Sequence, residues 1–308
     1  MKKNSIHFII LTALSLILAS CASKTPEAMP TIVEQNKEFN TYWYTGKAEV
    51  NVYDIEQARY GELRNGKAVR IFVTEDFLLN KQVKKESMTT EPSASVLKMN
   101  FLNKFPTGIY DYSMMSSVFT PVDMSRFKKT VKVSMSSQEW CGHVWSQLNL
   151  DKDQYEFTGH SYFEKEGEQE YYMDYAFLED EIWTRMRLNP LGLPQGNIKI
   201  IPSLMHTRLL HYDAEPLNAI AGLTLKVNDD SHEFYVYTVK YENGRELQVH
   251  AHSQFPYRIT YWEDSYESGF GPNKKRLTTK ATLKKSVKEP YWGQNSNADE
   301  HLRQEIGL

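Results

Sequence analysis

Hydrophobic and polar residues alternate along most of the chain from residue 41 onward, a pattern typical of strands with one buried face. Between Tyr42 and Val52, tyrosine, alanine and valine residues share one face of such a segment. Thr45, Lys47, Glu49 and Asn51 occupy the other face. The pattern therefore predicts a strand in which these polar residues lie on the unburied side.

Comparable segments recur along the chain, separated by turn-forming residues. The expected strands lie near 69–73, 96–102, 110–119, 129–137, 155–163, 168–175, 221–227, 232–241, 245–253, 256–263 and 276–287. Asn65-Gly66 and Asn243-Gly244 predict hairpin turns, because both residues tolerate positive φ. Many short strands with regular spacing predict a mainly β fold, with one large antiparallel curved sheet or a barrel-like sheet.

Helical spacing replaces this alternation in the middle of the chain, where we expect a short helical insertion over residues 176–212. Phe177 to Leu188 has the spacing of a helix that ends at Asn189-Pro190. A second short helix is expected within Pro202 to Leu210, and a C-terminal one near Ala298 to Ile306.

The amino terminus has the pattern of an export signal. Lys2 and Lys3 precede an apolar stretch from Ile6 to Leu18. This stretch is shorter than the roughly 20 apolar residues that a membrane-spanning helix needs. A basic start, a short apolar middle and a small-residue end describe a cleaved signal peptide.

Leu18-Ala19-Ser20-Cys21 resembles the lipobox of bacterial lipoproteins. The resemblance implies cleavage before Cys21, with acyl chains such as palmitate attached to that residue. Ala22 stands where many inner-membrane lipoproteins have aspartate, which implies sorting to the outer membrane. We therefore expect a signal peptide over 1–20, a lipidated tether over 21–40 and one β-rich domain over 41–308, with the membrane as a partner through the anchor.

Composition narrows the possible partners. The 308 residues carry a formal charge of −3, and removal of residues 1–20 leaves 34 basic and 39 acidic residues, a charge of −5. No basic block is present, so nucleic acid is not an expected partner. Once Cys21 carries lipid, Cys141 is the one cysteine left, which excludes an internal disulfide.

Two histidines form the best candidate for metal binding. His250 and His252 would project to the same face of a strand, as two imidazole ligands of zinc can. Glu246 and Gln248 share that face, so a solvated strand face explains the same pattern. No second His or Cys pair has a convincing spacing, and we expect neither metal nor cofactor.

Other residues could serve catalysis. Cys141 and His143 could meet as thiol and imidazole, although a buried cysteine packed by two tryptophans explains the same segment. The acidic runs Glu179–Glu181 and Glu263-Asp264 lie beside tryptophans, a combination that glycosidases use. Acids at a helix start more often complement the helix dipole and stay solvated.

Residues 16–24 resemble the opening of the Maf family of septum formation inhibitors, which have a Leu-Ala-Ser-Ala-Ser-Pro-Arg-Arg run. This resemblance implies a cytoplasmic nucleotide pyrophosphatase with an α/β fold. Lys24-Thr25-Pro26 stands where the family has Pro-Arg-Arg, so the arginines thought to meet the nucleotide phosphates are missing. The matching stretch also ends the expected signal peptide, and no functional residue is carried over.

More of the chain resembles uncharacterised bacterial outer-membrane lipoproteins, some of which bear the Maf label. The resemblance covers residues 42–52, 186–190 and 290–292. It implies a location in the cell envelope and no activity.

These observations predict a non-enzymatic binding or scaffold protein of the envelope. Its ligand would be apolar, a glycan or a partner protein, held by an aromatic-rich concave face. The candidate lining residues are Tyr42, Tyr44, Tyr261 and Trp262. An envelope glycan-acting hydrolase is the alternative, and Maf-type nucleotide hydrolysis is a remote one.

Overall fold

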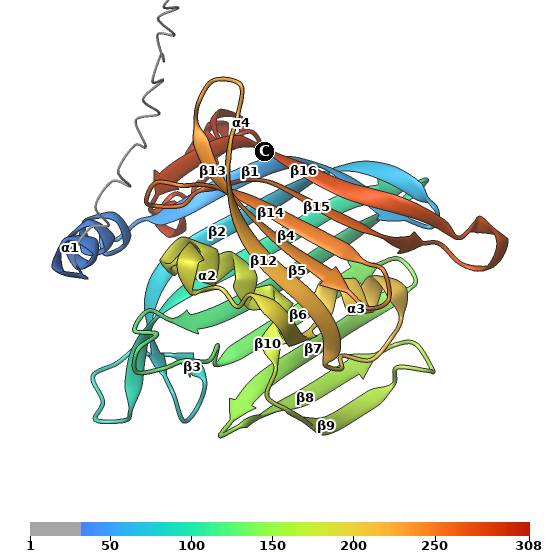
Figure 1. Ribbon diagram of the computed structural model, residues 1–308, viewed down its shortest axis with the longest axis horizontal. Coiled ribbons are helices and arrows are strands. Elements are labelled where there is room, and N and C mark those ends of the chain that lie inside the picture. Colours follow the sequence, from blue (N-terminus) through green and yellow to red (C-terminus); the bar gives the residue numbers. More distant parts are fainter. Residues whose placement is uncertain (1–31) are drawn as a thin grey trace, which may run out of the picture.

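The strands expected from the alternating pattern belong to one large, mostly antiparallel sheet (Figure 1). The computed structural model describes residues 32–308, so the expected signal peptide, Cys21 and the first part of the expected tether lie outside the described residues. A mainly β fold is what the chain's own pattern predicts, and it differs from the α/β fold that the Maf resemblance implies.

Sixteen strands form the sheet. Their bounds are β1 Ala48–Arg59, β2 Glu62–Leu78, β3 Val83–Lys84, β4 Ser93–Thr107, β5 Tyr110–Pro121, β6 Lys132–Glu139, β7 Gly142–Asp151, β8 Gln154–Ser161, β9 Glu168–Asp174, β10 Phe177–Leu178, β11 Gly196–Ile201, β12 Leu217–Val227, β13 Glu233–Tyr241, β14 Glu246–His252, β15 Ile259–Ser268 and β16 Lys275–Glu289. The helices are α1 Ile32–Trp43, α2 Ile182–Leu188, α3 Leu204–Leu210 and α4 His301–Glu305, with 3₁₀ turns at Glu179–Glu181, Pro190–Gly192, Gly271–Asn273, Tyr291–Gly293 and Asn297–Asp299.

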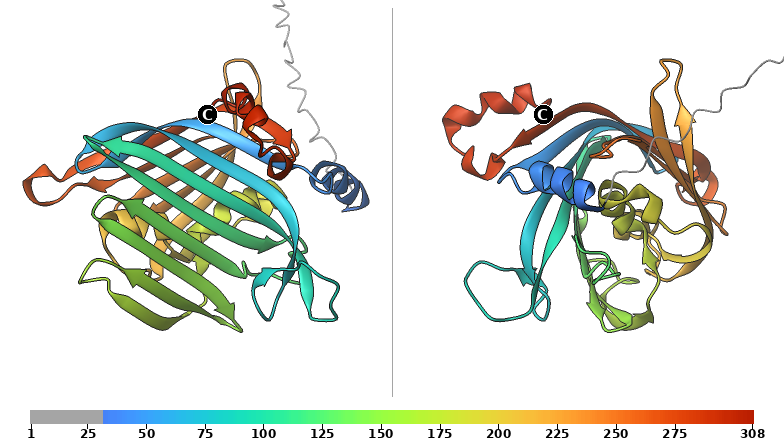
Figure 2. Two further views of the ribbon diagram at one scale, coloured as in Figure 1. Left: turned by 180° about the vertical axis from the view of Figure 1, so that it is seen from behind. Right: turned by 60° about the vertical axis from the view of Figure 1, so that its left-hand side comes forward.

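The sheet curls around α2 and α3, which lie on its concave side (Figures 1 and 2). Its strand order is β10-β11-β12-β13-β14-β15-β16-β1-β2-β4-β5-β6-β7-β8-β9, and only the β10–β11 pair is parallel. The edge strands β9 and β10 are consecutive in the chain, but no ladder joins them among the described residues, so the sheet is rolled and not closed. Within residues 32–308, no helix combines the length and hydrophobicity of a membrane span.

The helical insertion is confirmed, with two additions. Helices α2 and α3 fall inside the two expected helical segments, and the short strands β10 and β11 accompany them. Helix α4 lies within the expected C-terminal helix, and its preceding 3₁₀ turn begins one residue earlier, at Asn297. Strand β7 was not expected from the sequence.

The first expected strand is wrong at its amino-terminal end. Residues 32–43 form helix α1, and the strand begins at Ala48, so helix replaces the end of the expected tether as well. The reason is Trp43, which is 1% exposed and packs near Phe72 with ring centroids 6.3 Å apart. Thr74 Oγ1 also donates to the Trp43 carbonyl at 2.9 Å. Trp43 therefore holds α1 against the end of the sheet.

Strand β1 is buried on both faces, which corrects the expectation of a half-buried strand. Glu49 and Asn51 are fully buried and face α2 inside the curled sheet. Val50 and Val52 are buried on the outer side. The C-terminal segment covers them, because Gly307 approaches Val52 and the last turns of the chain lie over β1 (Figure 2).

One of the two expected hairpin turns is confirmed. Gly244 has φ of 85° and donates its N–H to the Tyr241 carbonyl at 3.0 Å, which joins β13 to β14. Asn65-Gly66 instead lies within β2, and the β1–β2 turn occurs at Tyr60-Gly61. Gly66 is needed for a different reason, because a Cβ there would lie 2.3 Å from the Lys104 carbonyl oxygen of β4.

This close approach makes Gly66→Ala a test of the β2–β4 packing. We expect the substitution to lower the free energy of unfolding by about 1–3 kcal/mol, since strands must shift to admit the methyl group. The matched control is Gly222→Ala on β12, where no atom lies within 4 Å of the new Cβ. Urea denaturation of both variants measures the effect, and equal stabilities would contradict the packing argument.

Candidate functional site

The acidic run at residues 179–181 is buried, which corrects the expectation of solvated charge. The three residues are 3%, 4% and 0% exposed. Glu181 binds Arg185 at 2.7 Å, while Asp180 accepts from Ser203 Oγ at 2.7 Å and caps α3. Glu179 faces Arg245. Glu181 and Asp180 therefore hold α2 and α3 within the helical insertion, while Glu179 ties the insertion to Arg245 beside β14.

Arg245, at the start of β14, connects two of the buried carboxylates. Its guanidinium donates to both Glu179 oxygens at 2.6 Å and to both Asp264 oxygens at 2.7 and 2.9 Å. Tyr241 also donates to Glu179, and His206 Nδ1 lies 3.4 Å from Asp264 Oδ2. Burial opposes the ionisation of Asp264, but the charge of Arg245 dominates and lowers the pKa of this carboxyl. The charges of this cluster are thus paired, and most N–H donors of Arg245 are already hydrogen-bonded to its carboxylates.

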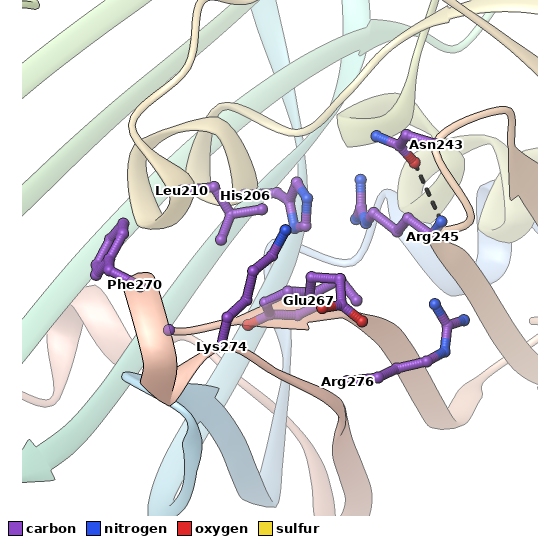
Figure 3. Close-up of a pocket in the computed structure, with 11 residues that line it drawn as sticks. His206, Leu210, Asn243, Arg245, Glu267, Phe270, Lys274 and Arg276 are labelled. Carbon is purple, nitrogen blue, oxygen red and sulfur yellow. Dashed lines mark hydrogen bonds between the residues drawn. The ribbon is translucent and has the colours of Figure 1, made fainter.

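Arg245 and His206 of this cluster line the floor of a cavity of about 400 Å³ (Figure 3), with the carboxylates behind them. The cavity opens where α3 meets the β13–β14 and β15–β16 turns. We call it the far-end pocket, because it lies at the end of the sheet far from α1. Its lining residues are His206, Leu210, Asn243, Arg245, Tyr266, Glu267, Gly269, Phe270, Gly271, Lys274 and Arg276.

Two exposed cations stand at the mouth of the far-end pocket. Lys274 extends from the β15–β16 turn toward His206 on α3, and Arg276 lies nearer Arg245 (Figure 3). Within residues 32–308, neither Lys274 nor Arg276 makes an ion pair. Glu267 is the one carboxylate that lines the pocket. The mouth therefore carries more positive than negative charge.

A row of rings continues from the pocket mouth across the same end of the sheet. Phe270 is 50% exposed, and its ring centroid lies 6.2 Å from Tyr60 and 5.9 Å from His211. His211 in turn contacts Phe163 of the β8–β9 turn at 5.4 Å. Beneath these rings lies the buried Arg59, 4.0 Å from the centroid of Tyr60. Rings from three turns and from His211, which follows α3 and also binds Glu166, thus form one aromatic ledge beside the mouth.

A second, smaller cavity of about 60 Å³ lies deeper and shares His206 and Arg245 with the far-end pocket. Arg70 lines it, 1% exposed, with its guanidinium carbon 3.4 Å from the Trp183 ring centroid and 3.8 Å from that of Phe101. No carboxylate of residues 32–308 contacts Arg70. Burial therefore lowers the pKa of Arg70 to about 9.

At the opposite end of the sheet, α1 and α2 meet over a second buried ion pair. Arg187 binds Glu49 through two hydrogen bonds of 2.5 and 2.8 Å, and both side chains are fully buried. Tyr42 and Asn51 also donate to Glu49. Burial alone would raise the pKa of Glu49, but Arg187 and these hydrogen bonds lower it to about 2.

The four tyrosine and tryptophan residues expected to line a ligand face do not converge. Tyr42 belongs to this ion-pair cluster, and Tyr44 is 49% exposed beside Ser95. Trp262 is 4% exposed in the core, where its ring lies 5.4 Å from that of Trp183. Tyr261 projects to the other face of β15 and donates to Glu263. None of the four lines the far-end pocket.

The histidine pair lies on a partly solvated strand face, as the sequence allowed. Leu247, Val249 and Ala251 of β14 are buried, while His250 is half-buried and His252 exposed. The His250 ring packs between Phe234 and Tyr261. Among the described residues, no group of three or more His, Cys, Asp or Glu side chains is placed to hold a metal ion.

Cys141 is exposed in the β6–β7 turn, which corrects the expectation of a buried cysteine. Trp140 beside it is 74% exposed and does not cover it. The Cys141 N–H donates to Glu139, and this neighbouring carboxylate raises the pKa of the thiol. A raised pKa disfavours the thiolate that nucleophilic catalysis requires.

No protein-family model and no curated protein matches the chain in sequence. Among solved structures, the crystal structure of a β-barrel-like protein of domain of unknown function DUF1849 from Brucella abortus is similar, with a TM-score of 0.45 and 9% sequence identity. The match covers 79% of this chain and 98% of that chain. An identity this low transfers no site residue.

The sequence signal for the far-end pocket was weak. Its lining comes from α3 and from two turns, the first of which contributes Asn243, 33 residues after Leu210, and nothing in the sequence distinguishes Lys274 and Arg276 from other turn cations. Asn243 lines the pocket through the one hairpin turn that was expected and confirmed. Sequence spacing cannot show that such segments meet.

The buried Asp180 gives the interior a pH dependence. Burial raises the pKa of this carboxyl to about 6 from 3.8, despite its hydrogen bonds. Because the folded pKa is the higher one, stability falls as pH rises from 3.8 to about 6. We expect Asp180→Asn to remove this loss, so that the variant gains about 2–3 kcal/mol relative to wild type between pH 3.5 and 7.

Urea unfolding at both pH values measures this difference. Asp153→Asn is the control, because Asp153 is exposed and Lys129 lowers the pKa of its carboxyl. The stability difference between Asp153→Asn and wild type should change with pH in the opposite sense and by a smaller amount. A difference between wild type and Asp180→Asn that does not change with pH would show that Asp180 ionises normally.

Proposed function

We propose that this protein is an exported, lipid-anchored binding protein of the bacterial cell envelope, without catalytic activity, which takes its ligand in the far-end pocket. The observation that carries the binding proposal is the pocket itself, a cavity of about 400 Å³ with a few polar side chains around an open mouth. Ligand sites are typically concave, largely formed in advance and of this size.

The arrangement of acids favours binding over glycan cleavage. Glycoside hydrolysis uses two carboxyl groups on either side of the scissile bond. Glu267 lines the pocket alone, while Glu179 and Asp264 are both held by Arg245 behind the pocket wall. Cys141 lies on a turn of its own with a raised thiol pKa. No observation therefore favours the hydrolase alternative.

The anchor and the pocket suit each other in position. Cys21 of the lipobox precedes Ile32, the first residue of α1, by 11 positions. A segment of this length spans at most about 40 Å when fully extended. Helix α1 lies at one end of the sheet (Figure 2), and the β15–β16 turn, which lines the pocket, lies at the other. A domain held through its amino terminus can therefore present the pocket away from the membrane.

Lipidation is tested by expressing the full chain in a Gram-negative bacterium with a palmitate analogue. We expect the wild-type protein to be labelled and to fractionate with the outer membrane. Cys21→Ser should lose the label, because the thiol is the acceptor. Cys141→Ser is the matched control and should stay labelled, and equal labelling of the two variants would contradict the anchor.

Ligand binding is tested by filling the pocket. Leu210 lines it, so Leu210→Trp should displace a small molecule that co-purifies with the full-length protein from membranes. Leu191→Trp is the control, because Leu191 is 47% exposed in a different turn. Native mass spectrometry reads the bound mass. If wild type and both variants carry the same species, or wild type carries none, the pocket is not the binding site.

A further inference from the structure

We infer that the ligand of the far-end pocket bears a phosphate or carboxylate group, bound between Lys274 and Arg276, and a sugar ring or apolar part that lies on Phe270. This inference rests on the proposed binding function and adds the chemical class of the ligand. It is argued from the charges of the pocket mouth and from the ring ledge beside it.

The charges of the pocket floor are already satisfied. Arg245 uses four hydrogen bonds to hold Glu179 and Asp264, at 2.6 to 2.9 Å. A guanidinium has five N–H donors, so little of Arg245 remains for a ligand. Recognition of a charged group consequently falls to the side chains of the mouth.

The mouth has two cations without ion-pair partners in residues 32–308, Lys274 and Arg276. Arg276 lies directly opposite Glu267 in the β15–β16 ladder, the position at which opposite charges usually pair. No ion pair joins the two side chains in the structure, although both line the cavity. An arginine fork with free donors fits the paired oxygens of phosphate and carboxylate.

Glu267 sets the selectivity of such a site. It is the one carboxylate on the lining, so it subtracts from the attraction that the two cations exert on an anion. Its removal should strengthen anion binding, whereas a site for a cationic ligand would lose affinity. The same substitution therefore separates the two charge classes.

The ring ledge indicates a ligand larger than a bare anion. Phe270 both lines the pocket and is 50% exposed, and the rings of its neighbours Tyr60 and His211 extend the aromatic surface. Aromatic faces bury apolar and sugar-ring surface that water would otherwise hydrate. A cavity of about 400 Å³ admits a ligand of one or two sugar rings.

The experiment titrates full-length protein in a neutral detergent with four probes by calorimetry. Glucose 1-phosphate and neutral glucose differ only in the anionic group, while glycerol 1-phosphate and inorganic phosphate represent a lipid headgroup and a free anion. We expect glucose 1-phosphate to bind more tightly than glucose, with an affinity that falls as salt rises from about 50 to 500 mM.

The variants assign the contacts. Lys274→Ala and Arg276→Ala should each weaken glucose 1-phosphate binding by about threefold to tenfold, and Glu267→Gln should strengthen it by about twofold to fivefold. Phe270→Ala should weaken glucose 1-phosphate but leave inorganic phosphate unchanged. Lys275→Ala is the matched control, since Lys275 is the exposed neighbour of Lys274 and does not line the pocket.

The outcomes separate this inference from the proposed function. Tighter binding of glycerol 1-phosphate, with the same dependence on Lys274 and Arg276, would support it and identify a lipid headgroup as the source. Equal affinity for glucose and glucose 1-phosphate, or equal effects of Lys274→Ala and Lys275→Ala, would overturn it. If Leu210→Trp still displaced the co-purified molecule in that case, the binding function would stand with a neutral ligand.

Discussion

The fold depends on the neutralisation of charge inside a curled sheet. Glu49 with Arg187 and Glu179 with Arg245 are buried pairs with short, bidentate geometry, and Arg245 also binds Asp264, whose side chain is 15% exposed. Moving such a charge out of water costs on the order of several kcal/mol per ion, unless the ion is paired and hydrogen-bonded. Both pairs connect the insertion between β9 and β12 to the sheet wall. The helices can occupy the interior only because the strands supply their counter-charges.

This constraint explains why the two ends of the sheet differ. At one end, Arg187 and Glu49 lie under α1, and Trp43 covers them. At the other end, Arg245 lines an open cavity, around which α3 and the β13–β14 and β15–β16 turns stand. The same kind of ion pair is therefore sealed at the amino-terminal end and forms the floor of a pocket at the other. Position along the strands, more than residue type, decides which role it takes.

Local pattern predicted the fold class well and the site poorly. Alternation predicted most strands because each strand has one face on the common core, and Asn243-Gly244 predicted its turn because the turn is a local structure. Asn65-Gly66 failed because contact with β4, about 40 residues away, decides what that glycine does. Glu179–Glu181 were expected in solvent because their partners Arg245 and Ser203 are distant in the sequence. Glu181 has a local partner in Arg185, but the burial of Glu179 and Asp180 depends on partners that no local window contains.

The ion pairs of Arg245 in the pocket floor also determine which charges remain at the pocket mouth to recognise a ligand. If Arg245 were free, a buried cation would dominate the pocket and bind any anion tightly and without regard to shape. Because two carboxylates hold it, the unpaired positive charge lies at the solvent edge on Lys274 and Arg276, where water and salt weaken it. Charge at the edge then attracts a ligand, and the enclosed Tyr266 and Leu210, with Phe270 at the rim, must discriminate by shape. Under the proposed function, such a division would suit a ligand that is bound and released, since neither contribution alone would hold it firmly.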